Sequence, residues 1–201
     1  MKKALFALVA TTLLAGSAYA TPALSNVTTG ATVTLVGNDF GNSQNWGASG
    51  TPAAASSIVD GASYAVGHQW NIGTVYWTSY NAGDSIQIDL KKTATVSSIF
   101  LQADNNDDYL IQYRGADKLW HDLTTVSPPD AWGLGNVSQA LPSSVTTDAF
   151  KIVGINGDHF YSVSEFSATG TIAAVPEPST YAMLGLGLGL LGWTARRRAA
   201  K

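Results

Sequence analysis

The body of this 201-residue chain consists largely of short segments in which apolar and polar residues alternate with a period of two. Residues 31–36 read ATVTLV, and residues 84–90 read DSIQIDL. Similar segments, rich in Val, Ile, Tyr and Phe, follow at 95–103, 108–114, 149–155 and 161–172. Alternation places every second side chain on one face of an extended strand, and no stretch of the body has the 3.6-residue apolar spacing of a helix. The pattern therefore predicts an all-β domain.

Turn-forming residues separate these segments. Asn, Gly and Asp cluster at 81–84, 104–107, 114–117 and 156–158. Short alternating strands joined by such turns are typical of an antiparallel sandwich or barrel. Two longer stretches, 37–57 and 127–144, have the composition of irregular loops, and loops of this length are usually functional or mobile.

The composition narrows the possible functions. The chain has no cysteine, so the domain is expected to be held together by its apolar core without disulfides, and thiol chemistry is excluded. Between residues 21 and 175, five Lys and Arg stand against thirteen Asp and Glu, an excess of eight negative charges. Because an acidic body repels phosphate backbones, we expect no nucleic-acid partner.

The first twenty residues have the layout of a secretory signal peptide. Lys2 and Lys3 precede an apolar run at 4–15, and Ala18-Tyr19-Ala20 is a small-residue cleavage site. A permanent N-terminal membrane helix is the alternative, but the apolar run is short for one. We therefore expect a signal peptide at 1–20 and a folded domain at 21–174.

The last segment, 175–201, combines three features in a fixed order. Pro176, Glu177 and Pro178 come first, an apolar segment occupies 181–195, and Arg196, Arg197 and Arg198 follow it. This series resembles the PEP-CTERM sorting signal of Gram-negative bacteria. The resemblance implies export across the inner membrane, processing by an exosortase, and delivery to the cell surface or extracellular matrix.

The apolar segment is short for a membrane span. About fifteen residues form roughly 22 Å of helix, less than the ~30 Å of a bilayer core, and four glycines weaken the helix further. We expect a short helix that serves as a transient inner-membrane anchor, with the arginines on the cytoplasmic side.

A second resemblance covers roughly residues 57–170. SIVDG at 57–61, YWTS at 76–79, GDSIQIDL at 83–90, FKIV at 150–153 and VSEF at 163–166 are similar to pieces of the discoidin-like (coagulation-factor type C) galactose-binding-like domains, in the family's order. The resemblance implies a jelly-roll β-sandwich of about eight antiparallel strands. It also implies glycan binding through loops at one end and, in many members, a structural calcium.

One departure from that family pattern stands out. Sixteen residues separate Asp60 from Trp77, where family members usually have only a few. The insertion contains His68, Gln69 and Trp70 and falls near the family's metal loop. The insertion can therefore alter both the calcium site and the sugar specificity that the resemblance implies.

The resemblance implies Asp60 and Glu165 as calcium ligands. Calcium binds several oxygen atoms, usually of carboxylates and backbone carbonyls. Glu165 is the only Glu between residues 21 and 175, and it interrupts an alternating strand. A carboxylate in such a place needs a partner or a metal unless it points to solvent, and both readings remain open.

The acidic run DNNDD at 104–108 has the spacing of the start of an EF-hand loop. Position twelve of such a loop would be Gly115 instead of Glu, and Tyr109 stands where glycine is needed. We therefore predict a hairpin turn between the strands at 95–103 and 108–114.

Loop aromatics are candidates for carbohydrate binding, because the C–H faces of sugars stack on aromatic rings while their hydroxyls need fixed polar partners. The candidates for stacking are Trp46, Trp70, Tyr80 and Trp132, and the polar candidates are His68, Gln69, Asn71, Asp104 and Arg114. A loop tryptophan that only covers the core is the alternative reading.

Catalysis finds little support in the sequence. There is no G-x-S-x-G or H-E-x-x-H motif, and the three histidines lack metal-ligand spacing. We expect no enzyme activity. The hypothesis is an exported surface or matrix protein that binds carbohydrate, and a structural matrix protein with protein–protein contacts and no sugar site is the alternative.

Overall fold

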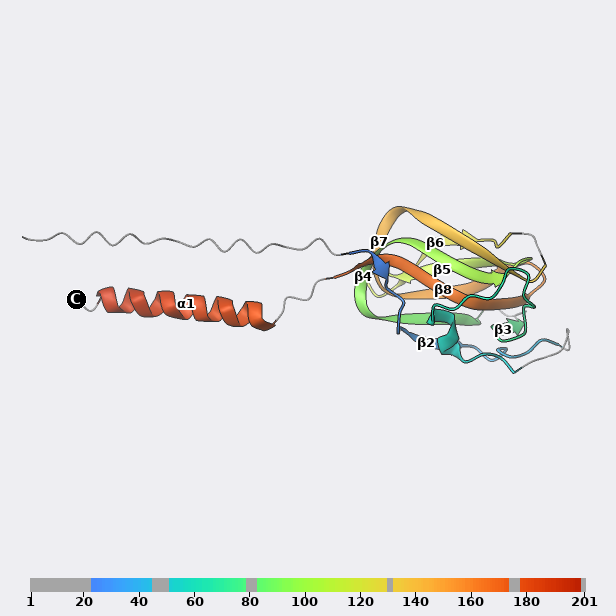
Figure 1. The fold of residues 1–201 in the computed structure, drawn as a ribbon, viewed down its shortest axis with the longest axis horizontal. Helices are drawn as coiled ribbons and strands as arrows, with labels where there is room; N and C mark the ends of the chain where they lie inside the picture. The colour runs from blue at the N-terminus through green and yellow to red at the C-terminus, as the bar shows by residue number, and fades with distance from the viewer. Residues whose placement is uncertain (1–22, 45–50, 79–82, 130–131, 174–177, 200–201) are drawn as a thin grey trace, which may run out of the picture.

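The computed structural model describes residues 23–44, 51–78, 83–129, 132–173 and 178–199 (Figure 1). Eight strands and two helical elements follow one another along the chain: β1 (Ser25–Asn26), β2 (Thr32–Val36), the 3₁₀ helix η1 (Ala55–Val59), β3 (Val75–Thr78), β4 (Ser85–Asp104), β5 (Asp108–Arg114), β6 (Trp120–Val126), β7 (Leu134–Asn156), β8 (Phe160–Ile172) and α1 (Pro178–Ala199). Every strand pair is antiparallel. The predicted all-β domain is confirmed.

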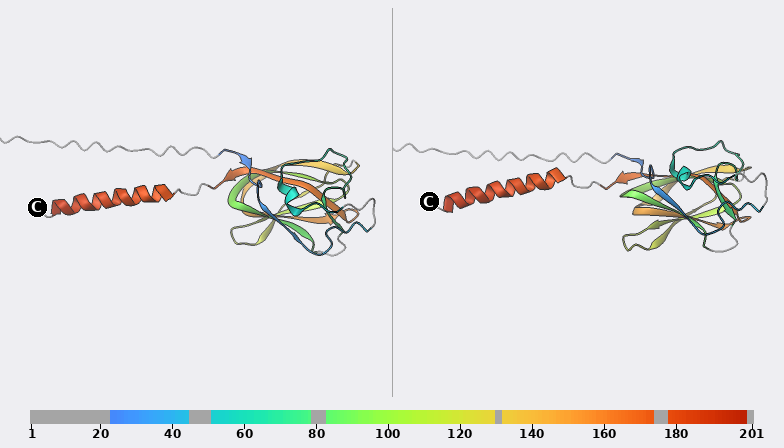
Figure 2. Two further views of the ribbon diagram at one scale, coloured as in Figure 1. Left: turned by 60° about the horizontal axis from the view of Figure 1, so that its bottom comes forward. Right: turned by 90° about the horizontal axis from the view of Figure 1, so that it is seen from below.

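The two longest strands, β4 and β7, form one antiparallel ribbon that belongs to both layers of the sandwich. Their pairing runs from Ile86 opposite Ile152 to Asp104 opposite Leu134. Register shifts after Asp89 and after Val96 bend the ribbon, which Figure 1 shows as the sharp turn of β4. Before the bend β4 pairs with β2, and after it with β8. The ladder therefore folds over on itself as a jelly roll (Figure 2).

The core lies between the two layers and follows from the alternation in the sequence. Ile86, Ile88 and Ile111 are fully buried, as are the larger rings of Trp77 and Phe150. Each such side chain contributes roughly 1.5–3 kcal/mol on burial. A core of this size explains how the domain holds together without disulfides.

The sandwich has two different ends. The terminal end carries the β4–β7 bend, the β5–β6 turn, β1 and the last residues of β8, since Ser25 pairs with Gly170 and Ala94 with Ile172. The loop end carries the connections β2–β3, β4–β5, β6–β7 and β7–β8. Figure 1 shows these loops gathered at the side away from the bend.

Two predictions from local sequence are wrong. The stretch 127–144 was expected to be irregular, but β7 begins at Leu134, because Val137 and Leu141 alternate toward the core despite the Ser- and Pro-rich composition. The run 104–108 was expected to be a hairpin turn, but β5 pairs with β6 and β7. The connection therefore crosses between the layers, because turn residues specify a change of direction and not the pairing partner.

The C-terminal segment is helical, as expected. The helix α1 has 22 residues and extends beyond the predicted 181–195 at both ends. Within the part of the chain that the structure describes, no helix combines the length and hydropathy needed to cross a membrane. Arg197 lies over the ring of Trp193, 3.9 Å from its centroid.

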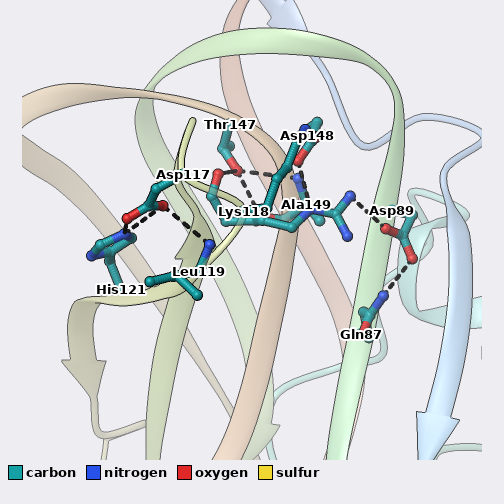
Figure 3. A network of polar contacts seen from close by, with 10 residues as sticks. Gln87, Asp89, Asp117, Lys118, Leu119, His121, Thr147, Asp148 and Ala149 are labelled. Carbon is teal, nitrogen blue, oxygen red and sulfur yellow. Dashed lines mark hydrogen bonds and ion pairs between the residues drawn. The ribbon is translucent and has the colours of Figure 1, made fainter.

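Arg114, which was predicted to contact a ligand, forms ion pairs with Asp89 and Asp148, two carboxylates of the polar network shown in Figure 3. Its Nε donates to Oδ1 of Asp148 at 2.7 Å and its Nη2 to Oδ1 of Asp89 at 2.8 Å. Lys118 Nζ contacts the other oxygen of Asp148 at 2.7 Å. The bond to Asp148 raises the pKa of Arg114. The role of Arg114 is thus corrected: it joins β5 to β4 and β7 beside the bend.

We expect Arg114→Ala to lower the free energy of unfolding by about 1–3 kcal/mol, because two partly buried carboxylates lose their partner. Lys118→Ala is the matched control, with an expected cost below about 1 kcal/mol, since its ammonium is largely exposed. Urea denaturation of both variants measures the difference. Equal losses would show that Arg114 has no special structural role.

Candidate functional site

The insertion between Asp60 and Trp77 forms a loop, here called the inserted loop (residues 61–74), that covers the outer face of the sheet. Trp70 anchors it. Its ring is only 6% exposed and meets Tyr76 edge-on at 5.6 Å, and Ser162 Oγ donates to its backbone carbonyl at 2.7 Å. The prediction that Trp70 stacks on a sugar is therefore corrected. Its role is to attach the inserted loop to β3 and β8 with Phe160 and Leu134.

Trp132 lies in the β6–β7 connection and is 66% exposed. The backbone next to it is joined to the inserted loop, because Gly67 N–H donates to the Leu134 carbonyl and Leu134 N–H to the His68 carbonyl, both at 2.9 Å. Gly133 makes this approach possible, since a Cβ there would lie 2.2 Å from the His68 carbonyl oxygen. The fold thus places an exposed tryptophan directly beside the inserted loop.

His68 also lies at this junction. Its ring stacks on Tyr64, with centroids 4.2 Å apart and planes inclined by 8°. Its Nε2 is 2.8 Å from the carbonyl oxygen of Ile72. The Tyr64 hydroxyl donates to the Gly73 carbonyl at 2.9 Å. Tyr64 was not among the predicted ligand residues, although it is an aromatic residue within the insertion.

The side chains around this junction form the loop-end surface, made of the exposed Tyr64, Val66, Ile72 and Trp132 and the half-buried His68. It combines aromatic faces with nearby backbone carbonyls. Gln69 and Asn71 bond to each other beside it, at 3.1 Å, but Asn71 is fully buried. Such a surface suits a ligand with flat C–H faces and hydroxyl groups.

Asp104 lies beneath the loop end instead of on it. Burial raises its pKa to about 7, against the hydrogen bond from the Asn105 backbone, and the charge of Asp158 adds to the rise. Burial and then Asp158 raise the pKa of Asp107 to about 8. Asp107 Oδ1 accepts from the Asp158 N–H at 3.2 Å, whereas Oδ2 has no hydrogen-bond partner among the described residues. Both carboxyls are therefore partly protonated near neutral pH.

Charge is segregated between the two ends. The five basic residues of the body lie at the bend, at the β5–β6 turn or within β7: Lys91, Lys92, Arg114, Lys118 and Lys151. The described acidic residues in or next to the loops of the loop end are Asp39, Asp60, Asp84, Asp104, Asp107, Asp108, Asp158 and Glu165. Asp84, Asp104, Asp107 and Glu165 are buried, so the accessible carboxylates of the described loop end are those of Asp39, Asp60, Asp108 and Asp158, with no ammonium or guanidinium group among them.

Glu165 lies close enough to Asp60 for the charge of Asp60 to act on it, and it bonds to the backbone of Gly61, the next residue. Glu165 is 2% exposed, so it does not point to solvent. Its Oε2 accepts from the Gly61 N–H at 3.2 Å. Within the described part of the chain, neither its Oε1 nor the buried Oγ of Ser57 has a hydrogen-bond partner. Burial, with a smaller contribution from the charge of Asp60, raises the pKa of Glu165 to about 7 against the opposing effect of the Gly61 N–H bond.

The residues next to Glu165 supply oxygen atoms of the kind that a hard cation binds. A cavity of about 160 Å³ is lined by Ser57, Asp60, Ser63 and Ser164, whereas Glu165 itself does not line it. Two carboxylates, a hydroxyl without a partner and loop carbonyls are the oxygen ligands that calcium prefers. No group of three or more His, Cys, Asp and Glu suited to a metal occurs among the described residues, so backbone and hydroxyl oxygens would have to complete the site.

The structure does not bring all of the predicted ligand residues together. His68 and Trp132 are neighbours at the loop end, Asp104 and Trp70 lie beneath it, and Arg114 is at the opposite end. Trp46 and Tyr80 lie outside the described residues, as do Pro176 and Glu177 of the sorting signal.

Comparison with known proteins identifies the C-terminal sorting motif and the fold of the β-domain. Residues 174–198 match the model of the PEP-CTERM protein-sorting motif, which implies export and a cell-surface or extracellular location. No curated protein matches the chain by sequence.

Among solved structures, the family 32 carbohydrate-binding module of Clostridium perfringens NanJ, in complex with galactose, is similar with a TM-score of 0.52 and 16% identity, over 73% of this chain and 99% of that one. The family 32 module of Streptococcus pneumoniae EndoD gives 0.48 and 16%, over 72% and 98%. A chitosan-binding module from a Paenibacillus chitosanase/glucanase gives 0.49 and 19%, over 72% and 98%. The chain therefore carries a PEP-CTERM sorting motif, and its β-domain has the fold of the family 32 carbohydrate-binding modules.

Proposed function

We propose that this protein is an exported surface or matrix protein that binds a polysaccharide through the loop-end surface. The observation that carries the proposal is the exposure of Trp132, at 66%, on a loop fixed to its neighbour by backbone hydrogen bonds. Because the backbone next to Trp132 is held in place while its ring is open to solvent, a sugar can stack on the ring with less loss of backbone conformational entropy. The fold and the sorting motif support the same conclusion.

The sorting motif completes the proposal. An exosortase would process the C-terminal segment while α1 holds the chain transiently at the inner membrane, and an exopolysaccharide of the producing cell would be the ligand. The alternative, a structural matrix protein with no sugar site, has support in the exposed Val66 and Ile72 beside Trp132. The two functions differ in whether free sugar competes with the interaction.

We expect Trp132→Ala to weaken polysaccharide binding by about tenfold or more, because the stacking face is lost. Isothermal titration with polysaccharide from the producing organism, or a glycan array, measures the change. Leu119→Ala is the matched control, since Leu119 is equally exposed but lies in the β5–β6 turn. Binding to matrix proteins that free sugars do not compete with would favour the structural alternative.

The charge segregation leads to a second expectation. The described loop end has carboxylates and no basic side chain, so it repels uronic-acid polymers. We expect neutral polysaccharides to bind about tenfold or more tightly than uronic-acid polysaccharides at low salt, and the difference to shrink as salt screens the repulsion. Tighter binding of the acidic polymers would contradict the assignment of this surface.

We also propose that Asp60 and Glu165 hold a structural calcium, together with Ser57 and loop carbonyls. Bound calcium would neutralise the buried Glu165 carboxylate and fix the start of the inserted loop at Gly61. Removing calcium should lower the melting temperature by about 5–10 °C, the effect of a ligand present at roughly 100 times its Kd.

Scanning calorimetry with and without a chelator tests the calcium proposal. Glu165→Gln should abolish the response and make the metal-free domain more stable, because the buried charge is removed. Asp60→Ala should also abolish it, whereas Asp122→Asn, in the distant strand β6, should leave it intact. A melting temperature that does not change on chelation would refute the site.

A further inference from the structure

Gln102 is a fully buried amide on the outer face of β4. Its neighbours Leu101 and Ala103 point into the main core, so the alternation of the strand directs Gln102 to the opposite face. That face would be solvent-exposed without the inserted loop. A polar side chain buried at such a place is costly unless its hydrogen-bonding groups are all used.

The amide of Gln102 makes four hydrogen bonds. Its Oε1 accepts from the Tyr64 N–H at 2.8 Å and from Ser164 Oγ at 2.7 Å. Its Nε2 donates to the Tyr64 carbonyl at 2.9 Å and to Asn136 Oδ1 at 2.6 Å. These bonds use both donors of the amide and two acceptor positions, so the side chain has one orientation only. A flipped amide would set its donors against the Tyr64 N–H.

These contacts join three parts of the chain to the inserted loop. Ser164 belongs to β8 and Asn136 to β7, while both backbone groups of Tyr64 bond to the same amide, much as in a strand pair. The contacts continue outward from Tyr64. Its ring stacks on His68, and the His68 carbonyl accepts from the N–H of Leu134, two residues after Trp132.

We propose that Gln102 is a positioning residue for carbohydrate binding: it fixes the first half of the inserted loop, and through it the place of Tyr64 and His68 beside Trp132. This inference rests on the proposed function of the loop-end surface. Trp70 anchors the second half of the loop by apolar contacts, and no other described side chain bonds to both backbone groups of Tyr64. Gln102 itself touches no ligand, because it is buried.

The test is Gln102→Met, which keeps the length of the side chain and removes all four hydrogen bonds. We expect amide hydrogen exchange at Tyr64 and across residues 62–69 to become about tenfold faster or more, with unchanged exchange in β5. We expect polysaccharide affinity to fall by about tenfold or more, because the loop-end surface loses its fixed shape.

Two control variants separate positioning from general destabilisation. Gln87→Met changes the same residue type on the same strand, where the amide of Gln87 donates to Asp89 and has no contact with the inserted loop among the described residues, and it should leave loop exchange and affinity unchanged. Ile111→Val removes a buried methyl group from the main core and should lower the melting temperature without accelerating exchange in the inserted loop. If Gln102→Met fails to fold, Asn136→Ala is the substitute, because Asn136 is exposed and accepts one of the four hydrogen bonds of the Gln102 amide. It should give a smaller change of the same kind.

The results overturn the proposal in either of two ways. Unchanged exchange at residues 62–69 would show that Gln102 does not hold the loop. Faster exchange with unchanged affinity would show that the loop does not shape the binding surface. If the wild-type protein binds no polysaccharide at all, the proposed function fails, and the exchange data still decide whether Gln102 fixes the loop.

Discussion

The pairing of β4 with β7 is the interaction on which the rest of the structure depends. One ribbon supplies strands to both layers, so every other strand takes its place from it: β2 and β8 pair with β4, and β5 pairs with β7. The bend after Asp89 converts one long pair into two facing layers. The bend of the ribbon lies at the terminal end of the sandwich, and both ends of β4 lie at the loop end. The Arg114 ion pairs strengthen the bend, where the backbone ladder is irregular.

The loop end is built as an additional layer on this frame. The inserted loop covers both polar and apolar residues on the outer face of the sheet. The apolar residues pack against the Trp70 ring, and the polar residues form hydrogen bonds with the loop backbone. Trp70 packs against Tyr76 and Phe160, whereas Gln102 uses its whole amide on the backbone of Tyr64 and on two strands. Apolar anchoring gives the loop affinity for the sheet, and the buried amide gives it one register, because only one alignment satisfies all of its groups. A surface that is fixed in this way can display an exposed tryptophan in one position.

Sequence reasoning found the parts of the fold that depend on local pattern. The alternation in β2, β5 and β8 was enough to predict strands. The burial of Trp77 does not follow from alternation, because all four residues of β3 are buried. Sequence reasoning missed the first half of β7, because Pro142 and the serines there have loop composition while Val137 and Leu141 still face the core. It misassigned Trp70 and Arg114, because Phe160 beside Trp70 and the two carboxylates bound to Arg114 are distant in sequence, and no local pattern indicates them. The approach of Asp60 to Glu165, across more than 100 residues, came from the family resemblance and not from periodicity.

The first strand, β1, and the end of the last strand, β8, lie at the opposite end of the sandwich from the loops. This arrangement determines which side of the domain faces away from a point of attachment at the C-terminal tail. Whatever holds the C-terminal tail holds the side of the sandwich that carries β1 and the end of β8. The opposite side, with Trp132, then projects outward by the length of the strands, and β5 alone spans about 23 Å. Many copies held on one surface would all face the surroundings with the same side. A weak contact at each copy would then add up to strong adhesion to a polymer with repeated units, because each bound unit raises the local concentration of the next.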